Sequence, residues 1–231
     1  MRKRHEAARV QAAASVRSPG HTGARVTTGA IPSPLQTHEV EQLGHEGYFL
    51  RPDWLSIEVA EDARAAFQAL DGFLPACVGR GEGRRELPEL RGDELRWLDG
   101  GEAGPGLTPV LRAFEQLKDE LNQQAYLGLD RRELQGARYL RRGALYTRHV
   151  DSFQGLAGRR VTFIYYLNPG WLPAHGGCLR LHLKAGAVDV PPRLNSLVVF
   201  LSEQVEHEVL ASFADRSALT AWWSGRSSSQ L

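Results

Sequence analysis

The chain changes to strand periodicity near residue 134. Beyond that point apolar and β-branched residues gather in short runs, separated by Gly, Pro or Asn. The runs are LQGARYLR, RVTFIYYLN, CLRLHLK, VDVPP, SLVVFLS, EHEVL and SALTAWW. Many short strands at close spacing, broken by turn residues, are typical of a β-sandwich or a β-barrel. This pattern predicts that the core of the protein is such a sandwich or barrel.

The first half of the chain has helical signals instead. Ser33-Pro34 resembles a helix start, and Gly47 predicts the end of that helix. A capped amphipathic helix is expected from Ser56, and another helix over about residues 108–126. Helices packed on a barrel predict one α+β domain over residues 34–226.

Two segments lack such periodicity. Residues 1–33 are rich in Ala, Ser, Thr, Gly and Arg, and we expect a disordered basic tail there. Residues 79–92, GRGEGRRELPELRG, are charged and rich in Gly, so we expect a mobile loop.

Composition and charge exclude several classes of protein. The net charge is +1, so no global basic field indicates a nucleic-acid or membrane partner. Only two cysteines occur, Cys77 and Cys178, which excludes a disulfide framework. No apolar run approaches the ~18–20 residues that span a bilayer, and the N-terminus lacks the apolar region of a secretory signal. We therefore expect a cytoplasmic protein.

A potential set of metal ligands is spread over the strand-rich half. His149 and Asp151 stand two residues apart in YTRHVDSF, a pattern that alone usually means a surface pair. His207 follows the apolar run SLVVFL and is the candidate for a third ligand, because a barrel brings distant strands together. Two histidines and one carboxylate on one face of a metal leave three positions open, as in non-haem Fe(II) oxygenases. The absence of a thiolate argues against structural zinc.

An arginine nine residues after His207 makes the pattern more specific. The strand period of two puts Arg216, Ala218, Thr220 and Trp222 on one face. A buried guanidinium costs free energy unless it meets an anion, and it pairs well with a carboxylate at two points. The distal carboxylate of 2-oxoglutarate is such an anion.

Hydroxyl groups on neighbouring strands extend this pocket. In RVTFIYYLN, Thr162 and Tyr166 share a face with Ile164, and their hydroxyls are candidates to surround the same carboxylate. Tyr139, ten residues before His149, is a candidate from the preceding strand.

The quoted segments also resemble a known family. ARYLRRGALYTRHVDSF, GRRVTFIYYLNPGW, GGCLRLH and EHEVLASFADRSALTAWW are similar to the catalytic core of prolyl hydroxylases in the 2-oxoglutarate/Fe(II) oxygenase superfamily. The resemblance is strongest to the oxygen-sensing hydroxylases of hypoxia-inducible factor and their bacterial relatives, and covers about residues 40–224. It implies a double-stranded β-helix (jelly-roll, cupin-like) core, with N-terminal helices packed on one sheet.

Roles follow from this resemblance by position. It implies that the iron ligands are His149, Asp151 and His207. It implies cosubstrate contacts from Arg216, Tyr139, Tyr166, Thr162, Thr220 and Leu179. It implies that Trp222 and Arg159 bind the substrate, and that Trp222 lies near a target proline. Arg159 would pair with Asp93 and so tie the loop 79–92, as a lid, to the core.

The activity implied is hydroxylation of a prolyl residue in a protein, with succinate and CO2 as co-products. The cofactors implied are Fe(II), 2-oxoglutarate as cosubstrate and O2, with ascorbate as a reductant. A translation factor is a candidate partner by analogy. Three alternatives stay open: hydroxylation of a free amino acid or another small molecule, a non-catalytic sensor that binds iron and 2-oxoglutarate, and nucleic-acid demethylation. The last is disfavoured, because Trp222 stands where that family has a second arginine.

Overall fold

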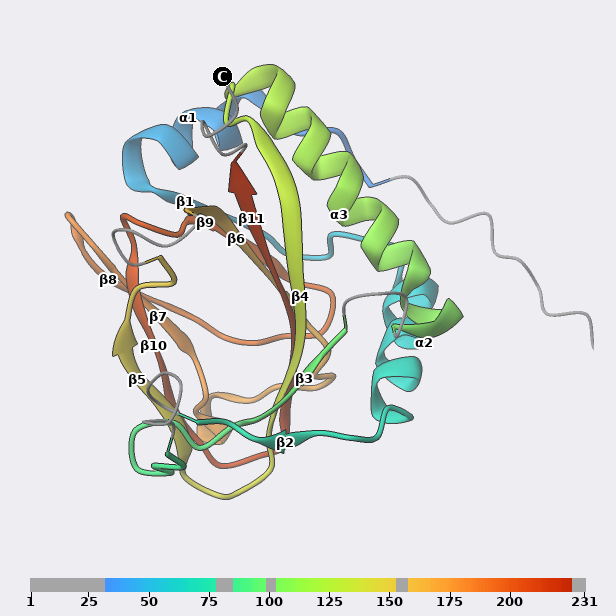
Figure 1. The fold of residues 1–231 in the computed structure, drawn as a ribbon, viewed down its shortest axis with the longest axis vertical. Coiled ribbons are helices and arrows are strands. Elements are labelled where there is room, and N and C mark those ends of the chain that lie inside the picture. Colours follow the sequence, from blue (N-terminus) through green and yellow to red (C-terminus); the bar gives the residue numbers. More distant parts are fainter. Residues whose placement is uncertain (1–31, 78–84, 99–102, 153–157, 226–231) are drawn as a thin grey trace, which may run out of the picture.

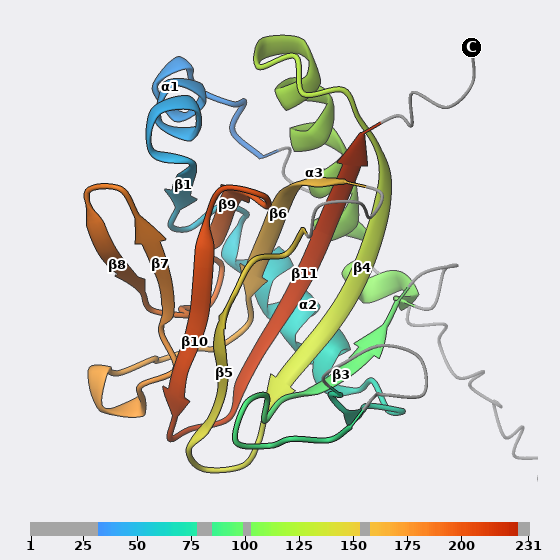
Figure 2. The same cartoon turned by 60° about the vertical axis from the view of Figure 1, so that its left-hand side comes forward.

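Two antiparallel sheets face each other in the computed structural model, which describes residues 32–77, 85–98, 103–152 and 158–225 (Figures 1 and 2). The larger sheet has the strand order β1-β9-β6-β11-β4-β3-β2, and the smaller has the order β5-β10-β7-β8. Residues 1–31 of the expected tail and residues 79–84 of the expected loop lie outside the described residues.

The strands of the larger sheet are β1 (Tyr48–Arg51), β2 (Leu74–Pro75), β3 (Glu94–Trp97), β4 (Leu129–Tyr139), β6 (Arg159–Tyr166), β9 (Leu197–Leu201) and β11 (Arg216–Gly225). Those of the smaller sheet are β5 (Ala144–His149), β7 (Leu179–Leu183), β8 (Gly186–Val190) and β10 (Glu206–Ser212). From β4 to β11 the chain passes repeatedly between the two sheets. This arrangement is a double-stranded β-helix, so the predicted fold class is confirmed.

Three helices, α1 (Thr37–Glu46), α2 (Ile57–Gln68) and α3 (Gly104–Gln124), lie on the side of the larger sheet that faces away from the smaller one (Figure 1). None of the described helices combines the length and the apolar character that a bilayer crossing needs. A short 3-10 helix, Pro173–His175, lies between β6 and β7.

The helix ends correct two sequence expectations. Helix α1 begins at Thr37 rather than Pro34, because the Arg51 guanidinium donates hydrogen bonds to the carbonyls of Ser33 and Pro34 at 2.9 and 3.1 Å. Helix α3 begins at Gly104, four residues earlier than predicted, and proline is tolerated in a first turn because its missing N–H has no intrahelical acceptor there. The expected Ser56 cap is present, with its side chain accepting from the Val59 N–H.

The larger sheet has an apolar core on each face. One core packs against the helices and contains the side chains of Phe114, Phe163 and Trp223. The other lies between the two sheets and contains Tyr166 and Phe200. Because both faces are covered, every residue of β11 except Ser217 is buried, and a polar side chain that points between the sheets needs a partner there.

Candidate metal centre

A pocket of about 190 Å³ opens between the two sheets. Side chains from β3, β4, β5, β6, β7, β10 and β11 line it, so strands far apart in the sequence contribute to a single site. The residues Arg216, Ala218, Thr220 and Trp222 all line this pocket, as the strand period predicts.

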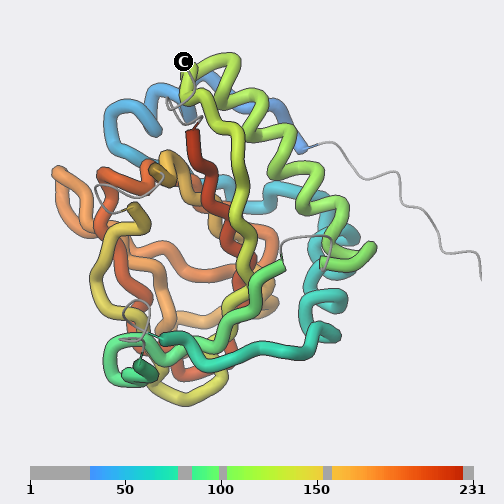
Figure 3. The backbone as a smooth tube through the Cα atoms, in the orientation of Figure 1, coloured from blue at the N-terminus to red at the C-terminus, as the bar shows by residue number. Residues whose placement is uncertain are grey.

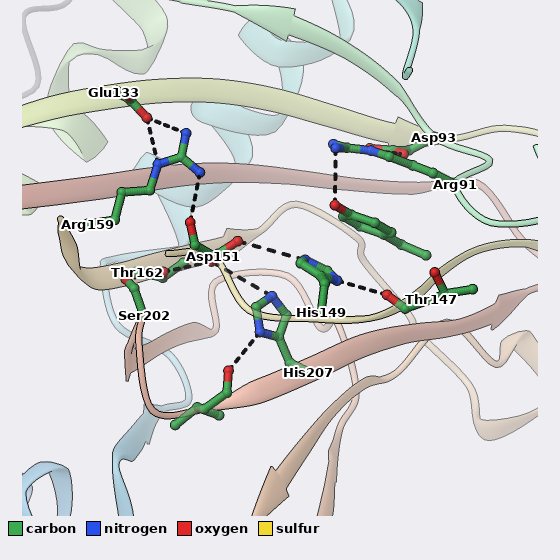
Figure 4. A network of polar contacts seen from close by, with 12 residues as sticks. Arg91, Asp93, Glu133, Thr147, His149, Asp151, Arg159, Thr162, Ser202 and His207 are labelled. Atoms are coloured by element: carbon green, nitrogen blue, oxygen red, sulfur yellow. Dashed lines mark hydrogen bonds and ion pairs between the residues drawn. The ribbon is translucent and has the colours of Figure 1, made fainter. Parts of the chain in front are cut away.

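The structure brings His149, Asp151 and His207 together at this pocket. His149 and His207 are cross-strand partners on β5 and β10, and Asp151 follows the end of β5. One potential ligand atom from each residue lies within 4.8 Å of the others, and no other such cluster occurs within the described ranges. The two His Nε2 atoms lie 3.8 and 3.7 Å from oxygens of Asp151 (Figure 4).

Hydrogen bonds select the tautomer of both histidines. The Nδ1 atoms of His149 and His207 lie 2.8 and 3.1 Å from the carbonyl oxygens of Thr147 and Val205 (Figure 4). A carbonyl can only accept, so Nδ1 carries the proton in each ring. The Nε2 lone pairs are therefore free and face Asp151. Two neutral imidazoles and one carboxylate are a donor set that suits Fe(II).

The electrostatics of the cluster favour the protonation states that bind a metal. Burial, followed by the neighbouring His207, lowers the pKa of His149 to about 4, so its ring is neutral at pH 7. Burial alone would raise the pKa of Asp151. The two histidines, Trp222 and Thr162 outweigh that effect and hold the pKa of the Asp151 carboxyl below its usual value. Asp151 is therefore ionised.

At the other end of the pocket lies a buried cation. Arg216 is 3% exposed, and no carboxylate of the described residues forms an ion pair with it. Its Nε–H donates to the Gly177 carbonyl at 2.9 Å, and its guanidinium lies 4.9 and 5.1 Å from the ring centroids of Tyr139 and Tyr166. The Tyr166 hydroxyl is also buried without a hydrogen-bond partner in the described ranges. A buried guanidinium without an ion-pair partner, beside a buried hydroxyl, is able to bind a carboxylate.

The remaining expected cosubstrate contacts divide into two groups. Thr220 and Leu179 line the pocket beside Arg216, as the resemblance implies. Thr162 does not lie beside Arg216. Its partner on β11 is Trp222, and six residues separate Trp222 from Arg216, which is roughly 20 Å along a strand. Its hydroxyl instead donates to Asp151 Oδ2 at 2.8 Å. The expectation that Thr162 surrounds the distal carboxylate is therefore wrong.

Arg159 is also placed differently from the expectation. Its Nε donates to Glu133 Oε2 at 2.7 Å (Figure 4). Its guanidinium lies 4.0 Å from the ring centroid of Trp222. Glu133 and Arg159 lie on the two strands that flank β11, close to Trp222, which explains this pairing. Asp93 pairs with Arg91 at 2.9 Å, so the expected pair between Asp93 and Arg159 is wrong.

Sequence reasoning missed the aromatic ring that covers His149. Tyr146 stacks on His149 with ring centroids 3.7 Å apart, and the Arg91 guanidinium lies 4.3 Å from the Tyr146 ring centroid. A regular strand would turn residues 146 and 149 to opposite faces. Here His207 pairs with His149 and Val209 with Tyr146, so one residue of β10 lies opposite two of β5, and this bulge puts both rings at the pocket.

The segment that carries Arg91 is itself paired to β5. The Thr147 N–H donates to the Leu90 carbonyl at 2.9 Å, and the Gly92 N–H donates to the Leu145 carbonyl at 2.8 Å. Figure 3 shows these two segments side by side, in green and yellow, although they are distant in the sequence. The described end of the expected loop thus forms one wall of the pocket.

The other two histidines of the strand region lie outside the pocket. His182 Nε2 is 2.9 Å from Glu208 Oε1, and His175 packs edge-on against Trp171. Neither lines the pocket, and both are partly buried.

Comparison with known proteins gives consistent matches. Residues 134–224 match the family model described as the 2OG-Fe(II) oxygenase superfamily. The human protein named "Prolyl hydroxylase EGLN3" is 36% identical over 141 residues, which cover 58% of this chain and 59% of that protein. The aligned part therefore spans less than two thirds of that relative.

Solved structures match over more of their length. A Pseudomonas putida prolyl-4-hydroxylase is 34% identical, with a TM-score of 0.73, and the match covers 82% of this chain and 98% of that one. A prolyl hydroxylase from Trichoplax adhaerens, solved with a hypoxia inducible factor peptide fragment, is 26% identical with a TM-score of 0.73. That match covers 80% of this chain and 87% of the other.

Proposed function

This chain belongs to the 2OG-Fe(II) oxygenase superfamily, and from that premise we propose that it hydroxylates a prolyl residue of a protein substrate, using 2-oxoglutarate and O2. The observation that carries the proposal is one pocket with the His149, Asp151 and His207 cluster at one end and the unpaired buried cation Arg216 at the other. A keto acid that chelates the metal and carries a distal carboxylate fits both ends.

Each group of residues has a separate task in this proposal. His149, Asp151 and His207 hold Fe(II) through two neutral imidazoles and a carboxylate. Arg216 and the Tyr166 hydroxyl bind the distal carboxylate, with Tyr139, Thr220 and Leu179 forming the walls. Iron bound there would supply, with 2-oxoglutarate and O2, the oxidising power for C–H hydroxylation. The 2-oxoglutarate would be converted to succinate and CO2. The protein orients the reactants and excludes water.

The substrate is proposed from the size of the pocket and its mouth. A volume of about 190 Å³ is below the ~300–1,000 Å³ typical of sites that enclose a drug-sized ligand. It suits the cosubstrate together with one side chain of a larger substrate. Trp97, which is 45% exposed, lies at the rim with its ring centroid 5.9 Å from that of Trp222, and Arg159 packs on Trp222 from the pocket side. These two tryptophans offer an apolar surface for a proline ring.

Several further parts belong to the same proposal. The catalytic domain comprises residues 34–226, and the protein acts in the cytoplasm. Two free cysteines, Cys77 and Cys178, fit a reducing compartment. Ascorbate serves as the reductant that keeps the iron ferrous, and the partner is a protein with an accessible proline.

The test has two stages. Purified protein is titrated under anaerobic conditions with Fe(II) and 2-oxoglutarate, and the visible charge-transfer band of the chelate is recorded. Air and a cell lysate are then admitted, and mass spectrometry searches for proteins that gain one oxygen on proline. The His207→Ala variant is the matched control, because it removes one ligand from β10 and is expected to lose both the band and the product.

The outcomes separate the alternatives. A band together with a hydroxyprolyl product supports the proposal and identifies the partner. A band with succinate formation but no modified protein would favour a small-molecule substrate. A band without succinate would favour a sensor. No band, or full activity of the His207→Ala variant, would refute the proposed site.

A further inference from the structure

Two buried hydroxyl groups lie behind the candidate iron carboxylate. The Thr162 hydroxyl is 2.8 Å from Asp151 Oδ2 and 2.8 Å from the Ser202 hydroxyl (Figure 4). We propose that Thr162, supported by Ser202, is a positioning residue that holds the Asp151 carboxylate in one orientation for metal binding. This inference rests on the proposed function, because it takes Asp151 to be a ligand.

The direction of each hydrogen bond follows from counting protons. The Thr162 hydroxyl donates to Asp151 Oδ2, so its single proton points to the carboxylate. The Thr162 oxygen is then left as an acceptor, and Ser202 must be the donor in the second bond. The result is a short one-way chain from Ser202 through Thr162 to Asp151. If the Thr162 hydroxyl donated to Ser202 instead, its oxygen lone pair would face the Asp151 carboxylate oxygen, and the two would repel each other.

The surroundings make this chain rigid. Thr162 and Ser202 are both 0% exposed, so no bulk water competes for their hydroxyls. Thr162 lies in the centre of the larger sheet, paired with Trp222 and Phe200, and a β-branched side chain has few χ1 rotamers. The Ser202 N–H donates to the Arg160 carbonyl at 3.0 Å. Both hydroxyls are therefore fixed by the backbone of the sheet.

Asp151 itself lies on less regular backbone. It follows the end of β5, and among the described residues its carbonyl accepts a long 3.5 Å hydrogen bond from Arg159 Nη1. The Thr162 bond is thus the strong contact between the carboxylate and the rigid sheet. It leaves the carboxylate facing the Nε2 atoms of His149 and His207, at 3.8 and 3.7 Å. Ordering the ligand in advance reduces the entropy lost when a metal binds.

The test compares metal affinity in variants of nearly equal shape. Thr162→Val removes the hydroxyl and keeps the branching, Thr162→Ser keeps the hydroxyl, and Ser202→Ala removes only the supporting donor. Ser212→Ala is the matched control, because Ser212 is an equally buried hydroxyl that donates to the Ala214 carbonyl instead. Dissociation constants for Co(II) are measured anaerobically without 2-oxoglutarate, through the d–d absorption of the bound ion.

Loss of a hydrogen bond behind a metal ligand typically weakens binding about 10–100-fold. We expect a loss in that range for Thr162→Val and a smaller loss for Ser202→Ala. Thr162→Ser and Ser212→Ala are expected to bind as the wild type does. The Co(II) absorption of Thr162→Val should also change in shape, which loss of stability alone would not cause.

Two results would overturn the inference. One is wild-type affinity in Thr162→Val, or in Ser202→Ala if the valine variant does not fold. The other is equal loss in Thr162→Ser and Thr162→Val, which would show that packing rather than the hydroxyl matters. A wild-type protein that binds no metal at all would refute the proposed function as well, so the two failures are distinguishable.

Discussion

Replacing Arg216 with methionine separates cosubstrate binding from folding. Methionine fills a similar volume without charge. In the absence of ligand, the change removes a buried cation that has no ion-pair partner in the described ranges, which is favourable. It also removes two cation–π contacts and leaves the Gly177 carbonyl without its 2.9 Å donor, which is unfavourable by about 1–3 kcal/mol. We expect these effects nearly to cancel, within about 2 kcal/mol.

Cosubstrate binding should respond much more strongly. Removing one partner of a buried, hydrogen-bonded charge pair costs about 2–5 kcal/mol, which corresponds to about 30- to 4,000-fold in affinity. In wild type, 2-oxoglutarate at 100 times its dissociation constant should raise stability by about 2.7 kcal/mol, and at the same concentration this shift should fall to about 0.9 kcal/mol or less in Arg216→Met. Affinity for the metal alone should change little, because Arg216 lies at the opposite end of the pocket.

The assay is isothermal titration of 2-oxoglutarate into protein loaded anaerobically with Mn(II), with thermal unfolding measured on the same samples. Leu111→Met on α3, outside the pocket, is a control for the substitution itself. Binding within threefold of wild type would refute the anchor role of Arg216. A large loss of stability with unchanged binding would show that the guanidinium serves packing alone.

Three further predictions concern a buried ion pair, a close packing contact and the ring that covers His149. Glu39→Gln should cost about 3–5 kcal/mol, since it leaves Arg51 buried and unpaired, as urea unfolding would show. Burial raises the pKa of Glu39, but the Arg51 hydrogen bond, the Gln36 backbone hydrogen bond and the nearby positive charges together outweigh it and lower the pKa below its ordinary value. The difference in stability should therefore be present at neutral pH and shrink as the pH falls through the lowered pKa of Glu39. Gly136→Ala puts a Cβ 2.8 Å from the Phe67 ring and should destabilise by about 1–3 kcal/mol, with unchanged Co(II) affinity in the folded protein. Tyr146→Leu should weaken Co(II) binding, whereas Tyr146→Phe should keep it, because the ring stacks on His149; equal loss in both would assign the effect to the hydroxyl.

Properties that depend on short stretches were predictable from the sequence. The alternation of RSALTAWW predicts which side chains of β11 line the pocket, and the observed lining follows it from Arg216 to Trp222. The Ser56 cap and the Gly47 end of α1 are equally local, because each satisfies backbone groups only a few residues away. The sequence also predicted that His149, Asp151 and His207 lie together, because a barrel brings distant strands side by side.

Register and partner choice were not predictable, because they depend on the whole sheet. Thr162 lies beside Asp151 rather than Arg216 only because β6 pairs with β11 in the observed register. Arg159 binds Glu133 because both flank β11, although they are 26 residues apart in the sequence. Tyr146 covers His149 only through a bulge in β5.

The sequence by itself therefore determined the alternation of buried and exposed faces and the chemical types of the candidate ligands, since both are properties of nearby residues. Only the tertiary structure decided which hydroxyl supports which carboxylate and which arginine meets which acid. Those pairings depend on strand order and register, which are set by burying two apolar cores at once.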